Sequence, residues 1–422
     1  MTAAVTPTGL DAEVLVIGGG PAGAATAHRI ATAGIRVVVV ERRTPPRPKT
    51  CGDALSPLAV AELAALGIGD ADLAVFHRVD AIRLVAGGRR AELSWPAHPA
   101  TGGHGYVARR SELDELVLDR ATAAGAELLA GHDAVAPIVE RGFLRGAVVL
   151  GPQGGTGEVR SRYTVVADGA NSRFGRALGT FRKRAWPYAT AIRSYWSSPL
   201  HDAPVIELVL DLADRDGTPI TGYGWVFPLA DGSVNIGAGV VSTSREFRSV
   251  NTTHLLASVA AQVAERWQID PARPHDPPAS GRIPLGGSVG PVAGPTYLVV
   301  GDAAGSANPL TGAGIEYAYA TGRLAGEVLV DAIEHRDSTA LQRYPVLVDE
   351  AYGTYFKVGR LLDRVAGRPW VMRRLAKTVV RLPGVGGAVV RIAANQLRPN
   401  HPGGAEIAFR AARTLTRFAP EA

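Results

Sequence analysis

The sequence predicts an α/β fold in which a parallel sheet covered by helices is interleaved with an antiparallel sheet and followed by a helical C-terminal region. The apolar run at residues 14–17 is short and β-branched, which is typical of a strand buried on both faces, and it leads through glycines and a helical pattern to a similar run at 37–40. Apolar residues instead alternate with others at 188–195, 205–212 and 233–241, which indicates strands of a sheet with one covered face.

A glycine-rich turn joins the first strand to the first helix. Gly18, Gly20 and Gly23 have the G-x-G-x-x-G spacing, which permits a tight turn, close approach of the backbone to a pyrophosphate and close packing of helix on sheet. The second strand ends at Glu41, about twenty residues later, where a carboxylate binds ribose hydroxyls in dinucleotide sites. The predicted dinucleotide-binding residues of this region are Gly18, Gly20, Ala22, Gly23, Glu41 and Arg42.

Two later turns follow buried strands in the same manner. Residues 164–166 lead into an Asp-Gly turn at Asp168, and residues 297–300 lead into Gly-Asp-Ala-Ala-Gly, which carries Asp302. The segment Asn-Pro-Leu-Thr-Gly-Ala-Gly then precedes a helical pattern at 317–333, whose N-terminus is suited to the inner phosphates and ring of a flavin. The candidate cofactor-binding residues here are Asp168, Asp302, Pro309, Gly312, Ala313, Gly314 and Ile315.

The order of these turns resembles the FAD domain of the p-hydroxybenzoate hydroxylase-like flavoproteins. The resemblance implies bound FAD, with Asp302 at its ribityl chain. The stretch Arg-Ser-Glu-Leu-Asp that begins at Arg110 is similar to the R-x-x-L-D helix start of that superfamily, which implies a contact between Arg110 and the FAD phosphates or ribose. Without the resemblance, Arg110 is interpreted as a surface residue at a helix start.

Two further stretches resemble the geranylgeranyl reductase family and, within it, the menaquinone reductase branch of the actinobacteria. Lys-Thr-Cys-Gly-Asp-Ala-Leu, which contains Cys51 and Gly52, is similar to K-x-C-G-x-G-L. Tyr223-Gly-Trp225-Val-Phe-Pro, with the later Asn-Ile-Gly-Ala-Gly, is similar to Y-x-W-x-F-P…N-x-G-x-G. The resemblance extends over residues 11–345, so it covers most of the chain.

Three positions bear on the kind of reaction. Gly305 stands where aromatic hydroxylases of this fold usually carry a histidine, which favours a reductase over a monooxygenase. Ala54 replaces the family's usual glycine, and Ala313 replaces its usual glutamate in the flavin-facing turn. Loss of a carboxylate beside the ring leaves the exact reaction open, although it does not affect the expectation of FAD.

The resemblance implies a reductase that saturates C=C bonds of an isoprenoid chain, either the menaquinone side chain or a geranylgeranyl group, by hydride transfer from reduced flavin. The family places Cys51 and Gly52 beside the ring, so that Cys51 gates the site or donates the proton; the alternative is a small buried thiol that only packs. Tyr223 and Trp225 form the cavity wall, or Tyr223 is the proton donor. Cys51, Tyr223 and Trp225 are the catalytic candidates.

Two other functions stay open at this point. One is an FAD-dependent tailoring oxidoreductase, an oxidase, monooxygenase or cyclase, of terpenoid or polyketide secondary metabolism. The other is a non-redox protein in which FAD is structural and the cavity binds a hydrophobic ligand. No second dinucleotide fingerprint is present, so NADPH would bind transiently or a ferredoxin would deliver the electrons.

The motif order divides the chain into three parts. The FAD-binding domain is discontinuous and is predicted at 11–85, 102–182 and 280–345. The substrate-binding sheet is predicted at 86–101 and 183–279, and a helical cap at 346–422.

Composition excludes several classes of protein. The single cysteine rules out a disulfide framework or a cysteine zinc site within the chain, and no metal-ligand spacing or nucleic-acid motif is present. Abundant Gly, Ala, Pro and Arg are typical of a high-GC bacterial genome. No secretion signal begins the sequence, and no apolar run reaches the ~18 residues of a membrane span, so a cytoplasmic protein is expected.

Cations dominate the region from 356 to 391. Asp363 is the only acid there, and the cations alternate with apolar residues and Trp370 in a helical pattern. This pattern favours peripheral contact with the anionic inner face of the cell membrane, where a polyprenyl substrate is collected; the alternative is a helical cap with a solvated face. The cations are Lys357, Arg360, Arg364, Arg368, Arg373, Arg374, Lys377, Arg381 and Arg391.

Overall fold

A mixed sheet carries the glycine turn at the ends of its parallel strands. The computed structural model describes residues 8–96, 102–214, 217–398 and 403–416. The strand order is β8-β2-β1-β11-β10-β9, and β19 also pairs with β11. Strands β8, β2, β1, β11 and β19 are parallel, whereas β9 and β10 are antiparallel. The bounds are β1 Thr8–Ile17, β2 Val37–Glu41, β8 Glu127–Ala130, β9 Asp133–Glu140, β10 Phe143–Leu150, β11 Thr156–Val166 and β19 Tyr297–Val299.

Three helices cover one face of this sheet: α1 (Pro21–Thr32), α4 (Arg110–Ala123) and α7 (Ile315–Glu334). Helix α7 packs closely on α1 because it presents glycine there; a Cβ at Gly322 would lie 2.3 Å from the Ala22 carbonyl oxygen. The opposite face of the parallel strands is covered by β9 and β10, the last two strands of the same sheet, and by the short α5 (Arg173–Ala177). All strands and helices that bear the predicted cofactor motifs therefore belong to one layered unit.

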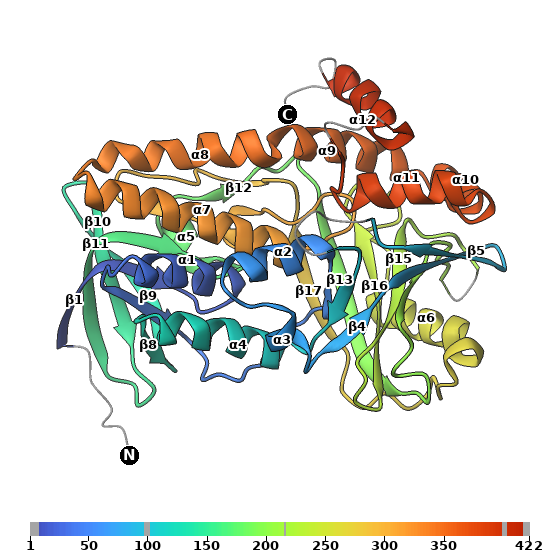
Figure 1. The fold of residues 1–422 in the computed structure, drawn as a ribbon, viewed down its shortest axis with the longest axis horizontal. Coiled ribbons are helices and arrows are strands. Elements are labelled where there is room, and N and C mark those ends of the chain that lie inside the picture. Colours follow the sequence, from blue (N-terminus) through green and yellow to red (C-terminus); the bar gives the residue numbers. More distant parts are fainter. Residues whose placement is uncertain (1–7, 97–101, 215–216, 399–402, 417–422) are drawn as a thin grey trace.

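The second sheet lies beside the first (Figure 1) and has the order β17-β13-β16-β15-β14-β5-β6. Its strands are antiparallel except for the parallel pair β14 and β5. Helix α6 (Thr252–Trp267) covers one face, and the C-terminal helices cover part of the other. The bounds are β5 Ala81–Ala86, β6 Arg89–Ser94, β13 Tyr188–Ser197, β14 Val205–Val209, β15 Gly222–Pro228, β16 Ser233–Val241 and β17 Ala279–Pro284.

Two domain boundaries differ from the sequence analysis. Residues 81–85 and 280–284 were predicted in the FAD-binding domain. They belong instead to strands β5 and β17 of the second sheet. The cause at β5 is the pair Gly87 and Gly88, which have φ of +58° and +70° and form the two-residue turn of the β5–β6 hairpin rather than a link between domains. Residues 97–101, assigned to the substrate domain, lie outside the described residues.

Short elements connect the two sheets. Strands β3, β7 and β4 form a small sheet, and β12 pairs with β18. Helix α2 begins after β3 and packs on α7. The bounds are β3 Ala54–Leu55, α2 Pro57–Ala65, α3 Asp70–Leu73, β4 His77–Val79, β7 Gly105–Val107, β12 Phe181–Arg182, β18 Val289–Gly290, and 3₁₀ turns at Gly301–Ala304 and Ser338–Gln342.

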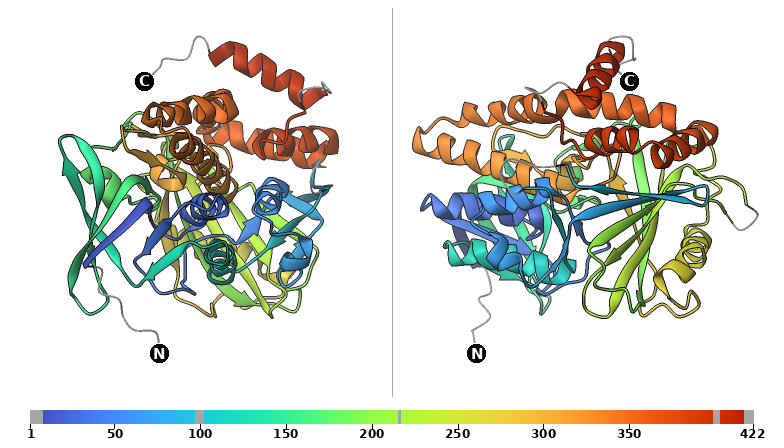
Figure 2. Two further views of the ribbon diagram at one scale, coloured as in Figure 1. Left: turned by 60° about the vertical axis from the view of Figure 1, so that its left-hand side comes forward. Right: turned by 45° about the vertical axis from the view of Figure 1, so that its right-hand side comes forward.

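The C-terminal region is helical, as predicted. Helices α8 and α9 follow one another through a π-helical turn and run along α7, while α10, α11 and α12 lie at the outer edge of the molecule (Figures 1 and 2). The bounds are α8 Arg343–Val348, the π turn Asp349–Gly353, α9 Thr354–Ala366, α10 Pro369–Arg381, α11 Pro383–Ala393 and α12 Gly404–Leu415. Residues 399–402 and 417–422 of the predicted cap lie outside the described residues.

Candidate active site

The glycine turn leaves no room for larger residues. Gly18 has φ of +102°, and a Cβ there would lie 2.4 Å from the Ala167 carbonyl oxygen. A Cβ at Gly23 would lie 1.8 Å from the Gly18 carbonyl oxygen. Gly20 is the N-cap of α1 and has no side chain to satisfy the first N–H groups of the helix, which stay available to an anion.

Glu41 lies at the end of β2, beside this turn. One carboxylate oxygen accepts a hydrogen bond from the Gly19 N–H at 2.8 Å, and the other accepts one from the Arg43 N–H at 3.0 Å. Arg47 Nε is 3.4 Å from the second oxygen. The Glu41 side chain is therefore held at the turn, whereas the neighbouring Arg42 is exposed.

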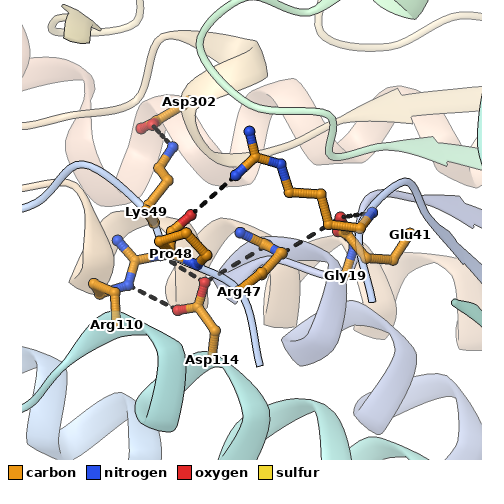
Figure 3. A network of polar contacts seen from close by, with 9 residues as sticks. Gly19, Glu41, Arg47, Pro48, Lys49, Arg110, Asp114 and Asp302 are labelled. Carbon is orange, nitrogen blue, oxygen red and sulfur yellow. Dashed lines mark hydrogen bonds and ion pairs between the residues drawn. The ribbon is translucent and has the colours of Figure 1, made fainter. Parts of the chain in front are cut away.

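Cations from two other segments complete this region (Figure 3). Arg110, at the start of α4, donates to both oxygens of Asp114 at 2.7 and 3.0 Å and is only 6 % exposed. Arg47 lies between Asp114 and Glu41, and a Cβ at Gly20 would be 3.3 Å from its guanidinium. The glycine cradle, the uncapped helix and these guanidinium groups fit the pyrophosphate of FAD.

The second half of the predicted cofactor site is the turn before α7. Asn308 shapes it, because its side-chain oxygen accepts hydrogen bonds from the N–H groups of Leu310 and Thr311. Asp302 is partly exposed and lies 3.8 Å from Lys49 Nζ (Figure 3). The other predicted residues of this segment lie in the turn or at the start of α7: Pro309, Gly312, Ala313, Gly314 and Ile315.

Asp168 has another role in this structure. Its Oδ2 accepts a hydrogen bond from the Phe174 N–H at 3.0 Å, so it holds the start of α5. Its Oδ1 is buried and accepts no hydrogen bond from the residues that the structure describes. Contact between Asp168 and the cofactor stays a prediction.

The three catalytic candidates lie together although two distant motifs supply them. The Asp53 N–H donates a hydrogen bond to the Cys51 sulfur at 3.4 Å, and Arg110 at the start of α4 interacts electrostatically with the thiol. The Tyr223 hydroxyl donates to the Thr311 carbonyl in the turn before α7, and burial, with the nearby Cys51, raises the pKa of Tyr223 to about 12. Trp225 is 6.0 Å from Tyr223 between ring centroids.

Comparison with known proteins fits this arrangement. Residues 11–213 match the family model described as FAD binding domain. The menaquinone reductase of Mycobacterium tuberculosis is 38 % identical over 91 % of each chain, and digeranylgeranylglycerophospholipid reductase 1 of Methanopyrus kandleri is 31 % identical over 83 % of this chain and 89 % of its own. A geranylgeranyl bacteriochlorophyll reductase-like protein from Thermoplasma acidophilum has the same fold, with a TM-score of 0.75, 23 % identity and coverage of 95 % and 96 %.

The chain belongs to the geranylgeranyl reductase family. It binds FAD and is an FAD-dependent oxidoreductase. The resemblance inferred from the Cys51 loop and the Tyr223 strand is thereby confirmed, and so is the predicted fold class. Which residues of this geranylgeranyl reductase family member contact FAD stays a prediction.

Several residues of the site were not predicted from sequence. Arg47 and Lys49 lie in the loop after β2, and Asp53 and Tyr195 form a buried hydrogen bond of 2.7 Å. Glu316 is the second residue of α7. A signal for Glu316 was available, because a carboxyl group inside an otherwise apolar stretch indicates a role other than solubility.

Glu41→Ala is expected to weaken FAD binding by about 1.5–3 kcal/mol, the usual range for hydrogen bonds to a charged group. The variant loses the carboxylate that is predicted to bind the ribose and also the acceptor that holds the Gly19 N–H. Titration of apoprotein with FAD measures the effect. Glu127→Ala, on the neighbouring β8, changes an exposed pair with Arg36 and is the control. An unchanged dissociation constant for Glu41→Ala would remove Glu41 from the site.

Glu316 gives the protein a pH-dependent stability. Burial raises the pKa of Glu316 from 4.5 to about 7, although the Ser56 hydroxyl donates to its carboxylate and acts in the opposite direction. The folded state thus binds the proton more tightly than the unfolded state. The stabilising contribution is fully present below pH 4.5 and is lost as the pH rises to about 7, with a total of about 3 kcal/mol.

Glu316→Gln removes this titration, so the variant should gain stability relative to wild type by about 3 kcal/mol between pH 4.5 and 8. Urea unfolding of both proteins across this range measures the difference, in which the other titrating groups cancel. Glu334→Gln, at the exposed end of α7, is the control. A difference that stays constant with pH would contradict a buried, protonated Glu316.

Proposed function

We propose that the protein saturates isolated C=C bonds in the side chain of menaquinone. The observation that carries the proposal is the convergence of Cys51 and Tyr223 at the turn before α7, because both side chains carry a transferable proton. The 38 % identical menaquinone reductase supports this substrate over a geranylgeranyl group.

Bound FAD, once reduced, supplies the hydride for one alkene carbon. The chain itself must position the alkene, exclude water and deliver a proton to the other carbon. The raised pKa of Tyr223, about 12, keeps its hydroxyl protonated at neutral pH. Cys51 is the candidate for the first proton transfer, and Tyr223 is the candidate that replaces it if the thiol only packs.

The wall beside these groups suits a prenyl chain. Trp225 stacks on Phe227 with ring centroids 5.9 Å apart, and both belong to an apolar cluster of the second sheet. Helices α10 and α11 contribute to the same cluster through Ala376, Val379 and Val390. Apolar surface from the sheet and the cap thus forms one cluster, against which Tyr223 packs.

The test is a single turnover without oxygen. The protein is reduced with dithionite and mixed with menaquinol that carries an unsaturated side chain, so that the quinone ring cannot accept the electrons. We expect flavin reoxidation and a product that has gained two hydrogen atoms. Menaquinol with a saturated side chain is the control and should leave the flavin reduced.

Two outcomes would contradict the proposal. A product that gains oxygen or isomerises would indicate the tailoring oxidoreductase of terpenoid or polyketide metabolism instead. Flavin that stays reduced with every unsaturated isoprenoid would favour a protein in which FAD is structural.

We further propose that the cap contacts an anionic membrane surface. No helix in the described part of the chain is long and apolar enough to cross a bilayer. Trp370, at the start of α10, is 65 % exposed, and Leu382 after its end is 54 % exposed. Arg373 and Arg374 are exposed on the same helix, while its buried face packs on the second sheet. Exposed apolar and cationic groups on one helix are typical of interfacial binding.

Replacing Arg373, Arg374 and Lys377 with Gln should weaken binding to anionic vesicles by roughly 1 kcal/mol per charge, and added salt should weaken wild-type binding. Sedimentation with phosphatidylserine vesicles, against neutral vesicles, measures both effects. The control variant replaces Arg145 and Arg162 of the first sheet, and Arg141 of the turn between β9 and β10, with Gln. Wild-type protein that fails to sediment would leave the segment as a structural cap.

A further inference from the structure

Asp53 is a buried carboxyl group directly behind the Cys51 loop. It follows Cys51 and Gly52 in the chain, and none of its surface is exposed. Its φ of +71° lies in the left-handed region, which aspartate tolerates better than most residues. The Ala108 N–H donates to the Asp53 carbonyl at 2.9 Å, which fixes the backbone in this conformation.

The Asp53 carboxylate connects this loop to two strands of the second sheet. Its Oδ2 accepts hydrogen bonds from the Tyr195 hydroxyl of β13 and the Asn235 amide of β16, both at 2.7 Å. The same Asn235 amide also donates to the Cys51 carbonyl at 3.0 Å. Asn235 Oδ1 accepts from the Trp225 indole N–H at 3.0 Å.

The orientation of the Asn235 amide follows from Trp225. An indole N–H can only donate, so the Asn235 atom that faces it must be the oxygen, and the amide nitrogen must face Asp53. Asp53 Oδ2 is therefore an acceptor. One carboxylate orients the Asn235 amide, which in turn holds both the indole and the Cys51 backbone.

Cationic groups surround the network. The guanidinium groups of Arg109 and Arg193 lie 4.4 and 4.5 Å from the centroid of the Tyr195 ring. Arg193 also donates to the Lys49 carbonyl, in the same loop as Asp53. Burial raises the pKa of Asp53, whereas the hydrogen bonds from Tyr195 and Asn235 lower it.

The loop has no freedom to approach the sheet more closely. A Cβ at Gly52 would lie 2.8 Å from the Phe227 ring and 3.2 Å from Trp225 Nε1. We infer that Asp53 is the positioning residue that holds Cys51 in register with Trp225 through Asn235 and Tyr195. Its effect on turnover rests on the proposed function, but its effect on the loop does not.

The single cysteine of the chain makes the loop directly measurable, because maleimide can react only with Cys51. In FAD-loaded protein, Asp53→Ala should raise the alkylation rate about tenfold, since the loop opens more often. It should also slow alkene-dependent flavin reoxidation by up to 10²-fold, the scale of a misplacement of about 1 Å. Asp53→Asn keeps an oxygen for both donors and should stay within a few-fold of wild type in both measurements.

Asp363→Asn is the matched control. Asp363 is a buried aspartate of α9 that accepts from the Thr243 hydroxyl at 2.9 Å, away from the loop, and its substitution should leave both rates unchanged. If Asp53→Ala does not fold, Tyr195→Phe removes one donor alone and should raise the alkylation rate about threefold.

The inference would be overturned if Asp53→Ala had wild-type rates of alkylation and reoxidation. Where Asp53→Ala does not fold, wild-type rates in Tyr195→Phe would overturn it. An equal acceleration of alkylation in Asp53→Asn and Asp53→Ala would also overturn it, because the acceptor geometry would then be irrelevant. If wild-type protein never reoxidises with an alkene, the proposed function fails, whereas the alkylation rates still test the role of Asp53.

Discussion

Gly23→Ala is expected to yield a protein that binds FAD about 5- to 150-fold more weakly and purifies with less yellow colour. The added methyl group would lie 1.8 Å from the Gly18 carbonyl oxygen and 3.2 Å from Val16 Cγ1. Gly18 cannot move away freely, because it is itself confined by Ala167. Overpacking of this kind costs about 1–3 kcal/mol, and a loss of 1.4 kcal/mol is tenfold in affinity.

The ratio of flavin to protein absorbance and titration of apoprotein with FAD measure this effect. Gly384→Ala is the control, because a Cβ there, on the C-terminal α11, meets no atom within 4 Å. Full FAD occupancy in Gly23→Ala would show that the turn can relax and that the close contact between α1 and the first sheet is not required.

Cys51→Ala is expected to retain FAD and fold but to slow alkene reduction by ~10²-fold, the usual scale of general acid catalysis. The thiol interacts electrostatically with Arg110 and with Tyr223, so it is placed between the FAD region and the aromatic wall. The single-turnover reoxidation rate of prereduced flavin is the measurement.

Tyr223→Phe is the comparison that assigns the proton. If Cys51 is the donor, Tyr223→Phe should lose less activity than Cys51→Ala, since the Tyr223 hydroxyl already donates to the Thr311 carbonyl. A rate within a few-fold of wild type in Cys51→Ala, with a large loss in Tyr223→Phe, would transfer the role to the tyrosine. Such a result would leave the reductase proposal itself intact.

The parallel half of the fold could be predicted because its determinants are local. Gly18, Gly20 and Gly23 adjoin the strand and helix that they connect, so spacing alone specifies the turn. The boundary at β5 could not be placed in this way. Gly87 and Gly88 are compatible with a linker or a hairpin, and only the pairing of β5 with β14 decides between them.

The active site could be predicted only where a contiguous motif carries it. Cys51 and Tyr223 lie in recognisable motifs, and the structure brings them together. The hydrogen bond between Asp53 and Tyr195 joins residues that are 142 positions apart in the sequence, and no spacing rule connects them. The pKa of Glu316 could not be predicted for another reason: it is raised by burial, which a sequence pattern does not quantify.

The discontinuous first sheet determines when the protein can capture its cofactor during synthesis. Strand β1 pairs with β11, and the turn that precedes α7 supplies the far side of the predicted FAD site. A nascent chain that has completed only α1 and β2 therefore offers one half of that site, and long-range pairing of this kind forms late. We therefore expect stable uptake of FAD only after α7 has left the ribosome, and truncated products that end before it should emerge without cofactor.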